Sequence, residues 1–206
     1  MCKIQQHYIQ YAERFAVTNN TRIWLGGSFL YDTATKYSDI DVSVYCNDIQ
    51  TIKSFIYSYG NPVYISYTSN PPGILIVIYE NGVAVDLEII EEINLHDCLY
   101  FHKDDLKNYS YKRNEELCKE IAIENSEIYQ ISRLFHRSLI KFLSGKKSTG
   151  ISIANEICDF IKVDYRIEDN NFKQQFSIML KDFSTTYNLP KNYYALIKQL
   201  LKEVSQ

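Results

Sequence analysis

The stretch that decides the fold covers residues 23–44 and reads IWLGGSFLYDTATKYSDIDVSV. It opens with a short apolar run and passes through Gly26 and Gly27. A second apolar run follows after a polar loop, and in it Asp39 and Asp41 alternate with apolar residues. Short apolar or alternating runs bounded by glycine are typical of strands joined by turns. The stretch therefore predicts a strand, a glycine turn, a loop and a second strand.

The two aspartates of this stretch are candidate metal ligands. Successive side chains of a strand point to opposite faces, so Asp39 and Asp41 share one face while Ile40 and Val42 face a core. Two neighbouring carboxylates repel each other unless a cation lies between them. Mg²⁺ takes oxygen ligands, and it commonly uses one or two carboxylates together with substrate phosphates. We therefore expect Asp39 and Asp41 to hold a divalent metal ion.

The glycine turn before the aspartates is a candidate phosphate site. Glycine lets backbone N–H groups approach a phosphate closely, and a short helix that begins at Ser28 would add the positive end of its dipole. Gly27 and Ser28 are the residues expected to contact the phosphates. The alternative is a hairpin turn followed by a surface strand with two solvated aspartates. That alternative is disfavoured because Asp has a low strand propensity.

Together these residues resemble a known signature. Gly27-Ser28, a loop of ten residues and then Asp39-Ile40-Asp41 are similar to the motif of the nucleotidyltransferase superfamily. This superfamily includes DNA polymerase beta, the aminoglycoside and lincosamide nucleotidyltransferases and the small minimal nucleotidyltransferases. The resemblance is specific over residues 25–44, weaker up to residue 88 and only architectural beyond residue 95. It implies an NTP co-substrate, for which we expect ATP, and two Mg²⁺ ions.

The same resemblance implies a third carboxylate on a later strand, beside the one that carries the two aspartates. Asp86, preceded by three apolar residues, is the matching candidate. Its implied role is to ligate the metal that activates the acceptor hydroxyl or to act as general base. The alternative is a solvated Asp86 on an exposed edge, because strand order cannot be read from the sequence.

Further carboxylates follow Asp86. Glu88 shares its strand face, and Glu91 and Glu92 come next in the chain. Glu88 is a candidate for binding a cationic acceptor or for acting as the base. Plain solvated charge near a strand end is the alternative for all three glutamates.

Periodicity and turn signals predict the remaining elements. A helix is expected over residues 4–16 and another over 49–59, after the capping pair Asn47-Asp48. Asn81-Gly82 is a strong hairpin signal within the next set of strands, expected over residues 63–67, 74–79 and 83–90. From residue 95 onward only helices are expected, over residues 95–101, 114–124, 127–143, 151–163, 172–183 and 193–204.

These elements predict an α+β fold, in which a small mixed sheet containing antiparallel strands is flanked by helices and followed by a C-terminal helical bundle. The expected division is a nucleotidyltransferase catalytic domain over residues 1–110 and a helical domain over residues 111–206. Within the helical part, four polar or basic residues on one helix are candidates for reaching a phosphate or an acceptor, with a solvated helix face as the alternative: Arg133, His136, Arg137 and Lys141.

Composition narrows the class of protein. The 206 residues carry a net charge of −3. Residues 1–110 hold 7 Lys/Arg and 13 Asp/Glu, a charge of −6, whereas residues 111–206 hold 15 and 12, a charge of +3. The chain has no basic block of the kind that binds long nucleic acid. This absence argues against a polymerase that acts on long DNA or RNA.

The sequence also bears on location and cysteine chemistry. No apolar run approaches the roughly 20 residues that span a bilayer, and the N-terminal residues lack a signal-peptide pattern, so we expect a cytoplasmic protein without a membrane partner. Neither a disulfide framework nor a zinc site is expected, because the five cysteines are widely spaced and never form a C-x-x-C pair: Cys2, Cys46, Cys98, Cys118 and Cys158.

The reaction expected from these observations is transfer of a nucleoside monophosphate from an NTP to a hydroxyl of a small molecule, with release of pyrophosphate. Among the relatives, size and the helical tail are most similar to the aminoglycoside and lincosamide enzymes, and the acidic residues around Glu88 favour a polycationic aminoglycoside. Two alternatives stay open. One is an antitoxin-like nucleotidyltransferase that transfers AMP to a protein, and the other is a catalytically silent nucleotide-binding module.

Overall fold

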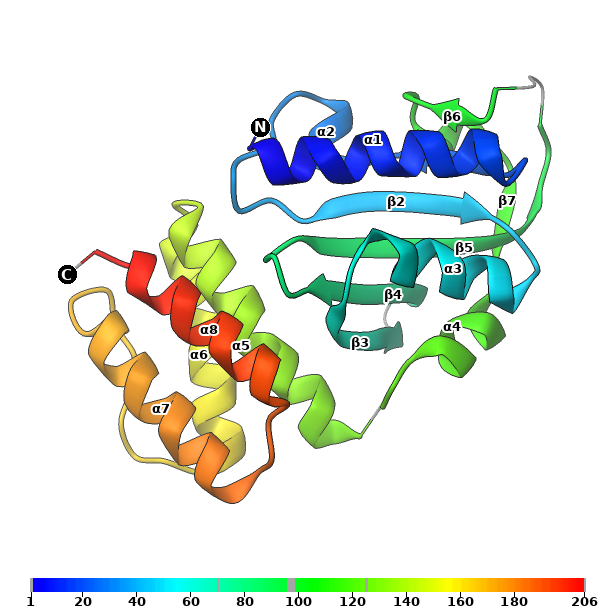
Figure 1. Cartoon of the computed structure of the whole chain (residues 1–206). Coiled ribbons are helices and arrows are strands. Elements are labelled where there is room, and N and C mark those ends of the chain that lie inside the picture. The colour runs from blue at the N-terminus through cyan, green and yellow to red at the C-terminus, as the bar shows by residue number, and fades with distance from the viewer. Residues whose placement is uncertain (1, 70, 96–98, 125, 206) are drawn as a thin grey trace. The chain divides into compact units, whose positions relative to one another are not determined.

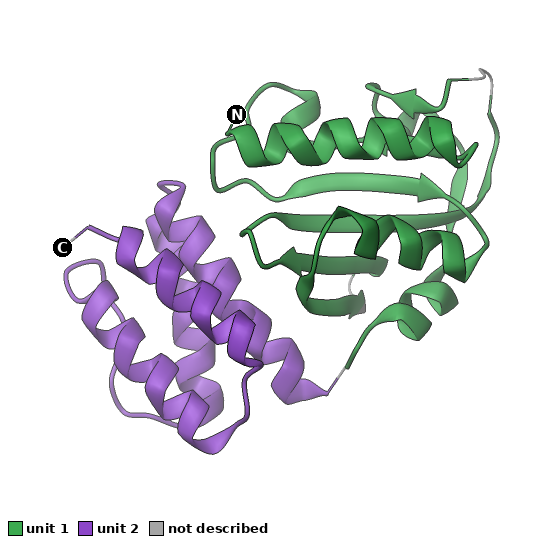
Figure 2. Ribbon diagram, in the orientation of Figure 1, with its two compact units in different colours: residues 1–124 green, residues 125–206 purple. Residues whose placement is uncertain are grey.

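The computed structural model describes residues 2–69, 71–95, 99–124 and 126–205 (Figure 1). The chain forms two compact units, Met1–Glu124 and Asn125–Gln206 (Figure 2).

The first unit is built on a mixed sheet, in which seven strands are found among the described residues. Six of them follow the order β3-β4-β5-β2-β1-β6, and β7 pairs with β5. The pairs β2–β5 and β1–β6 are parallel, whereas the other neighbours are antiparallel. The strands are β1 Arg22–Leu25, β2 Ile40–Tyr45, β3 Pro62–Ser69, β4 Pro72–Tyr79, β5 Ala84–Ile93, β6 Phe101–His102 and β7 Tyr111–Arg113.

Helices cover one face of this sheet. Figure 1 shows α1 and α3 lying over the same face. The α3 helix begins at the cap predicted for it, because the Asp48 carboxylate accepts a hydrogen bond from the Thr51 backbone N–H at 2.7 Å. The helical segments of this unit are α1 Lys3–Thr18, α2 Gly27–Leu30, α3 Ile49–Tyr59, the 3₁₀ turn η1 Leu106–Asn108 and α4 Glu115–Ile121.

The main core lies between the sheet and the α-helices of this unit. The alternation expected on the strands is observed, since Val42 and Val44 of β2 and Leu87 of β5 are buried in this core together with the helix residues Tyr8 and Phe55. The residues between them on each strand point to the opposite face. That face is covered only in part, by a small cluster built on Trp24, Ile90 and Leu106.

The segment after β5 differs from the prediction. The helix expected over residues 95–101 is wrong for the described part, because Phe101 begins β6 and no helix is present at residues 95 or 99–101; residues 96–98 lie outside the described residues. Strands also continue beyond residue 95. Both β6 and β7 are too short to show a periodicity of their own and exist because they pair with β1 and β5.

The boundary between the units also differs from the expected division after residue 110. It falls between residues 124 and 125. The reason is that β7 pairs with β5 and α4 packs against β3, β4 and β5, so residues 111–121 complete the first unit.

The second unit is a bundle of helices, as predicted. Phe135 and Leu139 of one helix pack in its interior with Ile157, Phe176 and Phe183, all of which are buried. The ranges predicted over 127–143 and 172–183 fall on helices, and the range predicted over 193–204 lies on a helix up to residue 203. The helix predicted over 151–163 begins four residues earlier and ends two residues earlier. The helices are α5 Glu127–Leu143, α6 Lys147–Ile161, α7 Phe172–Thr186 and α8 Lys191–Glu203.

A close backbone approach joins the first two helices of this bundle. The Ser138 hydroxyl of α5 donates a hydrogen bond of 2.7 Å to the Gly150 carbonyl of α6. A Cβ added at Gly150 would lie 2.8 Å from the Ser138 carbonyl oxygen and 2.8 Å from the Phe142 backbone nitrogen. Glycine at this position therefore allows the two helices to touch through their backbones.

Helix hydropathy and cysteine state bear on the sequence-based expectations for the described chain. Within it, no helix has the length and apolar character needed to cross a membrane. Four cysteines are free thiols, and burial raises the pKa of Cys118 to about 12 and that of Cys158 to about 11. The fifth, Cys98, lies outside the described residues.

Candidate active site

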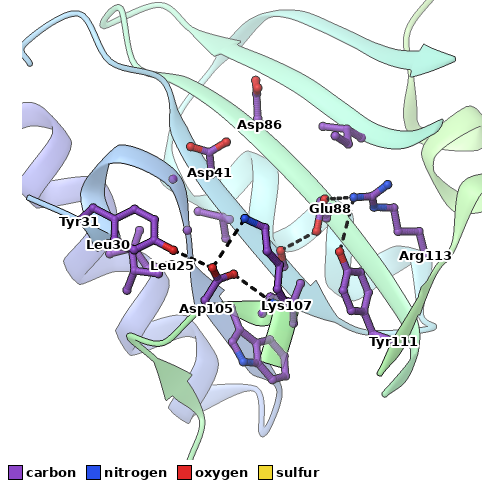
Figure 3. A pocket seen from close by; sticks show the side chains of 17 residues that line it. Leu25, Leu30, Tyr31, Asp41, Asp86, Glu88, Asp105, Lys107, Tyr111 and Arg113 are labelled. Atoms are coloured by element: carbon purple, nitrogen blue, oxygen red, sulfur yellow. Dashed lines mark hydrogen bonds and ion pairs between the residues drawn. The ribbon is translucent and has the colours of Figure 1, made fainter. Parts of the chain in front are cut away.

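A pocket of about 300 Å³ lies where the glycine turn meets strands β2, β5 and β7 (Figure 3). Its strand residues Asp41, Ser43, Asp86 and Glu88 are those that alternate with the core residues, so the pocket occupies the sheet face opposite the main core. A wall of η1 and the residue before it closes another side. Every lining residue belongs to the first unit.

Strand register brings the candidate carboxylates together. In the parallel pair β2–β5, Asp41 lies directly opposite Asp86, and Ser43 lies opposite Glu88. Both aspartates are partly buried and line the pocket. Figure 3 shows their carboxyl groups projecting from adjacent strands into the same space. Asp41 and Asp86 therefore lie side by side in one pocket, and their roles in metal binding and catalysis stay predictions.

The glycine turn is fitted to one of these carboxylates. The Gly26 backbone N–H donates a hydrogen bond of 2.9 Å to the Asp41 carbonyl. Gly27 has a φ of +57°, and a Cβ added there would lie 1.7 Å from Asp41 Oδ2. Only glycine leaves room for the Asp41 carboxylate in this conformation. The short helix expected from Ser28 begins one residue earlier, at Gly27.

Asp39 and Ser28 occupy less central positions. Asp39 is partly buried and precedes β2 by one residue. The loop before it is held by Gln5 of α1, whose side-chain amide donates to the carbonyls of Thr35 at 3.1 Å and Ser38 at 2.8 Å. In the described part of the chain, neither Asp39 nor Ser28 is among the residues that line the pocket.

The donor set suits a metal that shares its ligands with a nucleotide. Over the described ranges, no group of three or more His, Cys, Asp or Glu side chains is arranged to hold a metal ion. Asp41 and Asp86 nevertheless offer two adjacent carboxylates beside a turn that suits phosphate. Mg²⁺ is commonly bound by one or two carboxylates, with substrate phosphates completing its coordination. The residues present fit that mode rather than a preformed protein cage.

Glu88 does not present a bare negative charge. Its Oε1 accepts a hydrogen bond of 2.5 Å from Arg113 Nη2, and its Oε2 accepts one of 2.9 Å from the Ser43 hydroxyl. Burial lowers the Arg113 pKa, but the charges of Glu88 and Tyr111 and their hydrogen bonds together outweigh it, so this pKa lies above its ordinary value. Of the two glutamates that follow, Glu91 forms an ion pair with Lys112, and Glu92 is exposed.

The wall opposite Glu88 is a small hydrogen-bonded network. The Tyr31 hydroxyl donates to Asp105 Oδ2 at 2.6 Å, and Asp105 Oδ1 accepts from the Lys107 backbone N–H at 3.1 Å. The Lys107 ammonium lies 3.7 Å from Asp105 Oδ2. The hydrogen bond from Tyr31 is the main cause of the lowered Asp105 pKa, and the same bond raises the Tyr31 pKa.

Four residues that line the pocket were not predicted from the sequence: Tyr31, Asp105, Lys107 and Arg113. Asp105 falls between the helices expected over residues 95–101 and 114–124, and Arg113 lies just before the second of them. Their role depends on β7 pairing with β5 and on η1 folding over the pocket. For Tyr31 alone, the sequence offers a hint of a place in the site, because it follows the glycine turn closely in the chain.

The basic candidates on α5 belong to the second unit and differ in burial. His136 is buried, Arg133 and Lys141 are partly buried, and Arg137 is exposed. None of them is among the lining residues of the described pocket. A role for these four side chains in substrate binding stays a prediction.

A family model described as a nucleotidyltransferase domain matches residues 10–131. This range covers more than half of the chain and contains the glycine turn, both strands that carry the aspartates, and the residues of the opposite wall. A search of curated proteins found no match.

Proposed function

The chain belongs to the nucleotidyltransferase domain family, and on this basis we propose that it transfers a nucleoside monophosphate from an NTP, with ATP as the expected donor, to a hydroxyl of a small molecule. Pyrophosphate is the other product. The observation that carries the proposal is the direct pairing of Asp41 with Asp86 beside Gly27. The pairing places two carboxylates at the turn where phosphates are expected.

In the proposed reaction, Asp41 and Asp86 hold Mg²⁺, and Asp39 supplies a further carboxylate as predicted from the motif. Two ions are proposed. When bound, Mg²⁺ neutralises charge on the phosphoryl oxygens and lowers the pKa of the acceptor hydroxyl. The backbone at Gly27 and Ser28 is proposed to contact the triphosphate, because glycine allows close approach.

The remaining chemistry requires positioning and a proton acceptor. The acceptor oxygen attacks the α-phosphorus in line with the leaving pyrophosphate. Asp86 is proposed either to accept the hydroxyl proton or to ligate the metal that activates this hydroxyl. The protein contributes chiefly orientation and charge neutralisation, as is general for phosphoryl transfer.

The ion pair between Glu88 and Arg113 bears on which class of acceptor the pocket would bind. A polycationic aminoglycoside was favoured by uncompensated carboxylates, but Arg113 compensates Glu88 and Lys112 compensates Glu91. The support for a polycation is therefore reduced. We propose a small hydroxyl compound as acceptor and treat aminoglycosides as one class to be tested. The expectations of a cytoplasmic location and of no long nucleic-acid partner stay predictions.

A screen for pyrophosphate release tests this proposal. The full chain is incubated with Mg²⁺, each NTP and panels of neutral and cationic hydroxyl compounds. Asp86→Asn is expected to reduce the rate by about 10³-fold or more, whereas Glu92→Gln, on the same strand and exposed, should match the wild type. Absence of NTP binding, or full activity of Asp86→Asn, would contradict the proposal.

The same assay separates the acceptor classes. For a cationic acceptor, its KM should rise with salt and with Glu88→Gln. A neutral acceptor should be indifferent to salt. A release reaction that is confined to cationic compounds would restore the aminoglycoside hypothesis.

A further inference from the structure

Two basic side chains line the described pocket, Lys107 and Arg113, and they are held very differently. Arg113 lies on β7, its side chain is 27% exposed, and it is bound at 2.5 Å to Glu88. Lys107 lies on the 3₁₀ turn η1, its side chain is 84% exposed, and it is 3.7 Å from Asp105. The charge of Arg113 is therefore committed to Glu88, whereas that of Lys107 is only weakly engaged.

Asp105 does not depend on the Lys107 ammonium. Its carboxylate also accepts the Tyr31 hydroxyl at 2.6 Å and the Lys107 backbone N–H at 3.1 Å. These two bonds remain if the lysine side chain rotates away. They also anchor η1 beside the loop that follows the glycine turn. The Lys107 side chain can thus change its partner while its backbone stays in place.

The surroundings of Lys107 indicate which partner it would take. Figure 3 shows its side chain extending from η1 across the pocket, on the side where Leu25 and Asp41 lie. The other charged side chains that line the pocket, apart from Arg113, are acidic: Asp41, Asp86, Glu88 and Asp105. An NTP adds further negative charge at the glycine turn. An exposed and weakly paired cation beside that turn would lower the electrostatic cost of bringing the triphosphate into an acidic pocket.

We propose that Lys107 binds the triphosphate of the incoming NTP and stabilises the leaving pyrophosphate, an inference that rests on the proposed function. On NTP binding, the ammonium leaves Asp105 and donates to phosphate oxygens. In the transfer step the acceptor oxygen bonds to the α-phosphorus, and the bond to the bridging oxygen breaks with its electron pair on pyrophosphate. The hydroxyl proton passes to the carboxylate base, and Lys107 stays protonated throughout.

Binding measurements on the full chain test this assignment. Lys107→Met removes the charge and keeps a side chain of similar length, Lys107→Arg keeps the charge, and Lys103→Met is the matched control, since Lys103 is exposed and outside the pocket lining. The ligands are ATP with Mg²⁺, inorganic pyrophosphate with Mg²⁺, and adenosine. Each is titrated by calorimetry at several salt concentrations.

Lys107→Met is expected to lower the affinity for ATP and for pyrophosphate by about 10- to 100-fold, the range for a lost charge-assisted hydrogen bond. The affinity for adenosine should stay unchanged. The salt dependence of ATP binding should become less steep, and Lys107→Arg should restore most of the affinity. Lys103→Met should behave as the wild type.

Three outcomes overturn the assignment. ATP and pyrophosphate affinities equal to those of the wild type in Lys107→Met would refute it while leaving the proposed function intact. So would an equal loss in Lys103→Met, because the effect would then be one of general charge. A wild-type chain that binds neither ATP nor pyrophosphate would remove this inference and the proposed function together.

Discussion

The two faces of the sheet are made from the same strands but have opposite character. On the face covered by α1 and α3, Val42, Val44 and Leu87 are buried among aromatic side chains. On the other face, the intervening residues Asp41 and Ser43 line an open pocket with carboxylates and basic groups. Adjacent positions on one strand thus serve packing and chemistry in turn. Because the side-chain period is two, a slip of one residue in register would exchange the faces.

The comparison predicts that changes on the open face remove activity and spare stability. Asp41→Asn keeps the shape of the side chain but removes the charge that is proposed to hold the metal. We expect pyrophosphate release to fall by about 10³-fold or more, with an unchanged melting temperature. Calorimetry should also show no tightening of NTP binding by Mg²⁺. Retained metal dependence in this variant would show that Asp41 is not a ligand.

Changes on the covered face should do the reverse. Phe55 is fully buried on α3, and its ring lies 5.0 to 6.3 Å from those of Tyr8, Tyr11 and Phe15. Phe55→Ala is expected to reduce the free energy of unfolding by about 3–5 kcal/mol, measured by urea titration.

NTP affinity provides the control for Phe55→Ala. It should equal that of the wild type at temperatures where the variant is folded. A large loss of affinity in the folded variant would show that the two faces are coupled.

Gly27 lies where both effects meet. Its positive φ and its distance from Asp41 predict that Gly27→Ala strains the backbone by about 1–2 kcal/mol and also displaces the Asp41 carboxylate. The loss of NTP affinity should therefore exceed what the fall in melting temperature accounts for. If affinity and melting temperature fall in proportion, the glycine is required for folding alone.

The smallest expected effect is a pH dependence of the free energy of unfolding that arises on the covered face. Burial raises the pKa of Cys118, a residue of that core, to about 12. A raised pKa contributes stability below the ordinary thiol value, and this contribution is lost as pH rises, because the unfolded thiol ionises first. Between about pH 8 and pH 10, the wild type should lose about 1–2 kcal/mol more than Cys118→Ala in urea titrations.

An equal loss in Cys118→Ala and the wild type would show that the thiol ionises freely in the folded core. Cys46→Ser offers a comparison, since Cys46 is only partly buried.

Much of the fold follows from local pattern. The α3 and α5 helices were predicted with the bounds observed, because apolar periodicity and capping residues agree there. The strands β6 and β7 were missed, since two or three residues show no periodicity. Both strands form because they pair with longer strands, β6 with β1 and β7 with β5. These pairings depend on the tertiary structure and cannot be read from the local sequence.

The site divides in the same way. Gly27 and Asp41 belong to a motif with fixed spacing, and Asp86 is the candidate that the family resemblance implies on a later strand, so the sequence pointed to all three. The neutralisation of Glu88 could not be predicted from the sequence, because its partner Arg113 is brought to it by the pairing of strands β5 and β7. Lys107 was missed for a similar reason, since η1 approaches the glycine turn only after folding. Spacing along the chain therefore indicates the reaction class, whereas cross-strand partners determine the electrostatics of the pocket.

The parallel pairing of β2 with β5 also bears on how the protein folds. The hairpin of β4 and β5 closes through a short turn, whereas β5 reaches β2 only after α3, β3 and β4 have been passed along the chain. Contacts between distant segments carry a larger loop-closure entropy and tend to form late. Asp41 and Asp86 meet in that late contact. Recovery of NTP binding during refolding should therefore lag behind the formation of helices, and partly folded chains would lack a competent site.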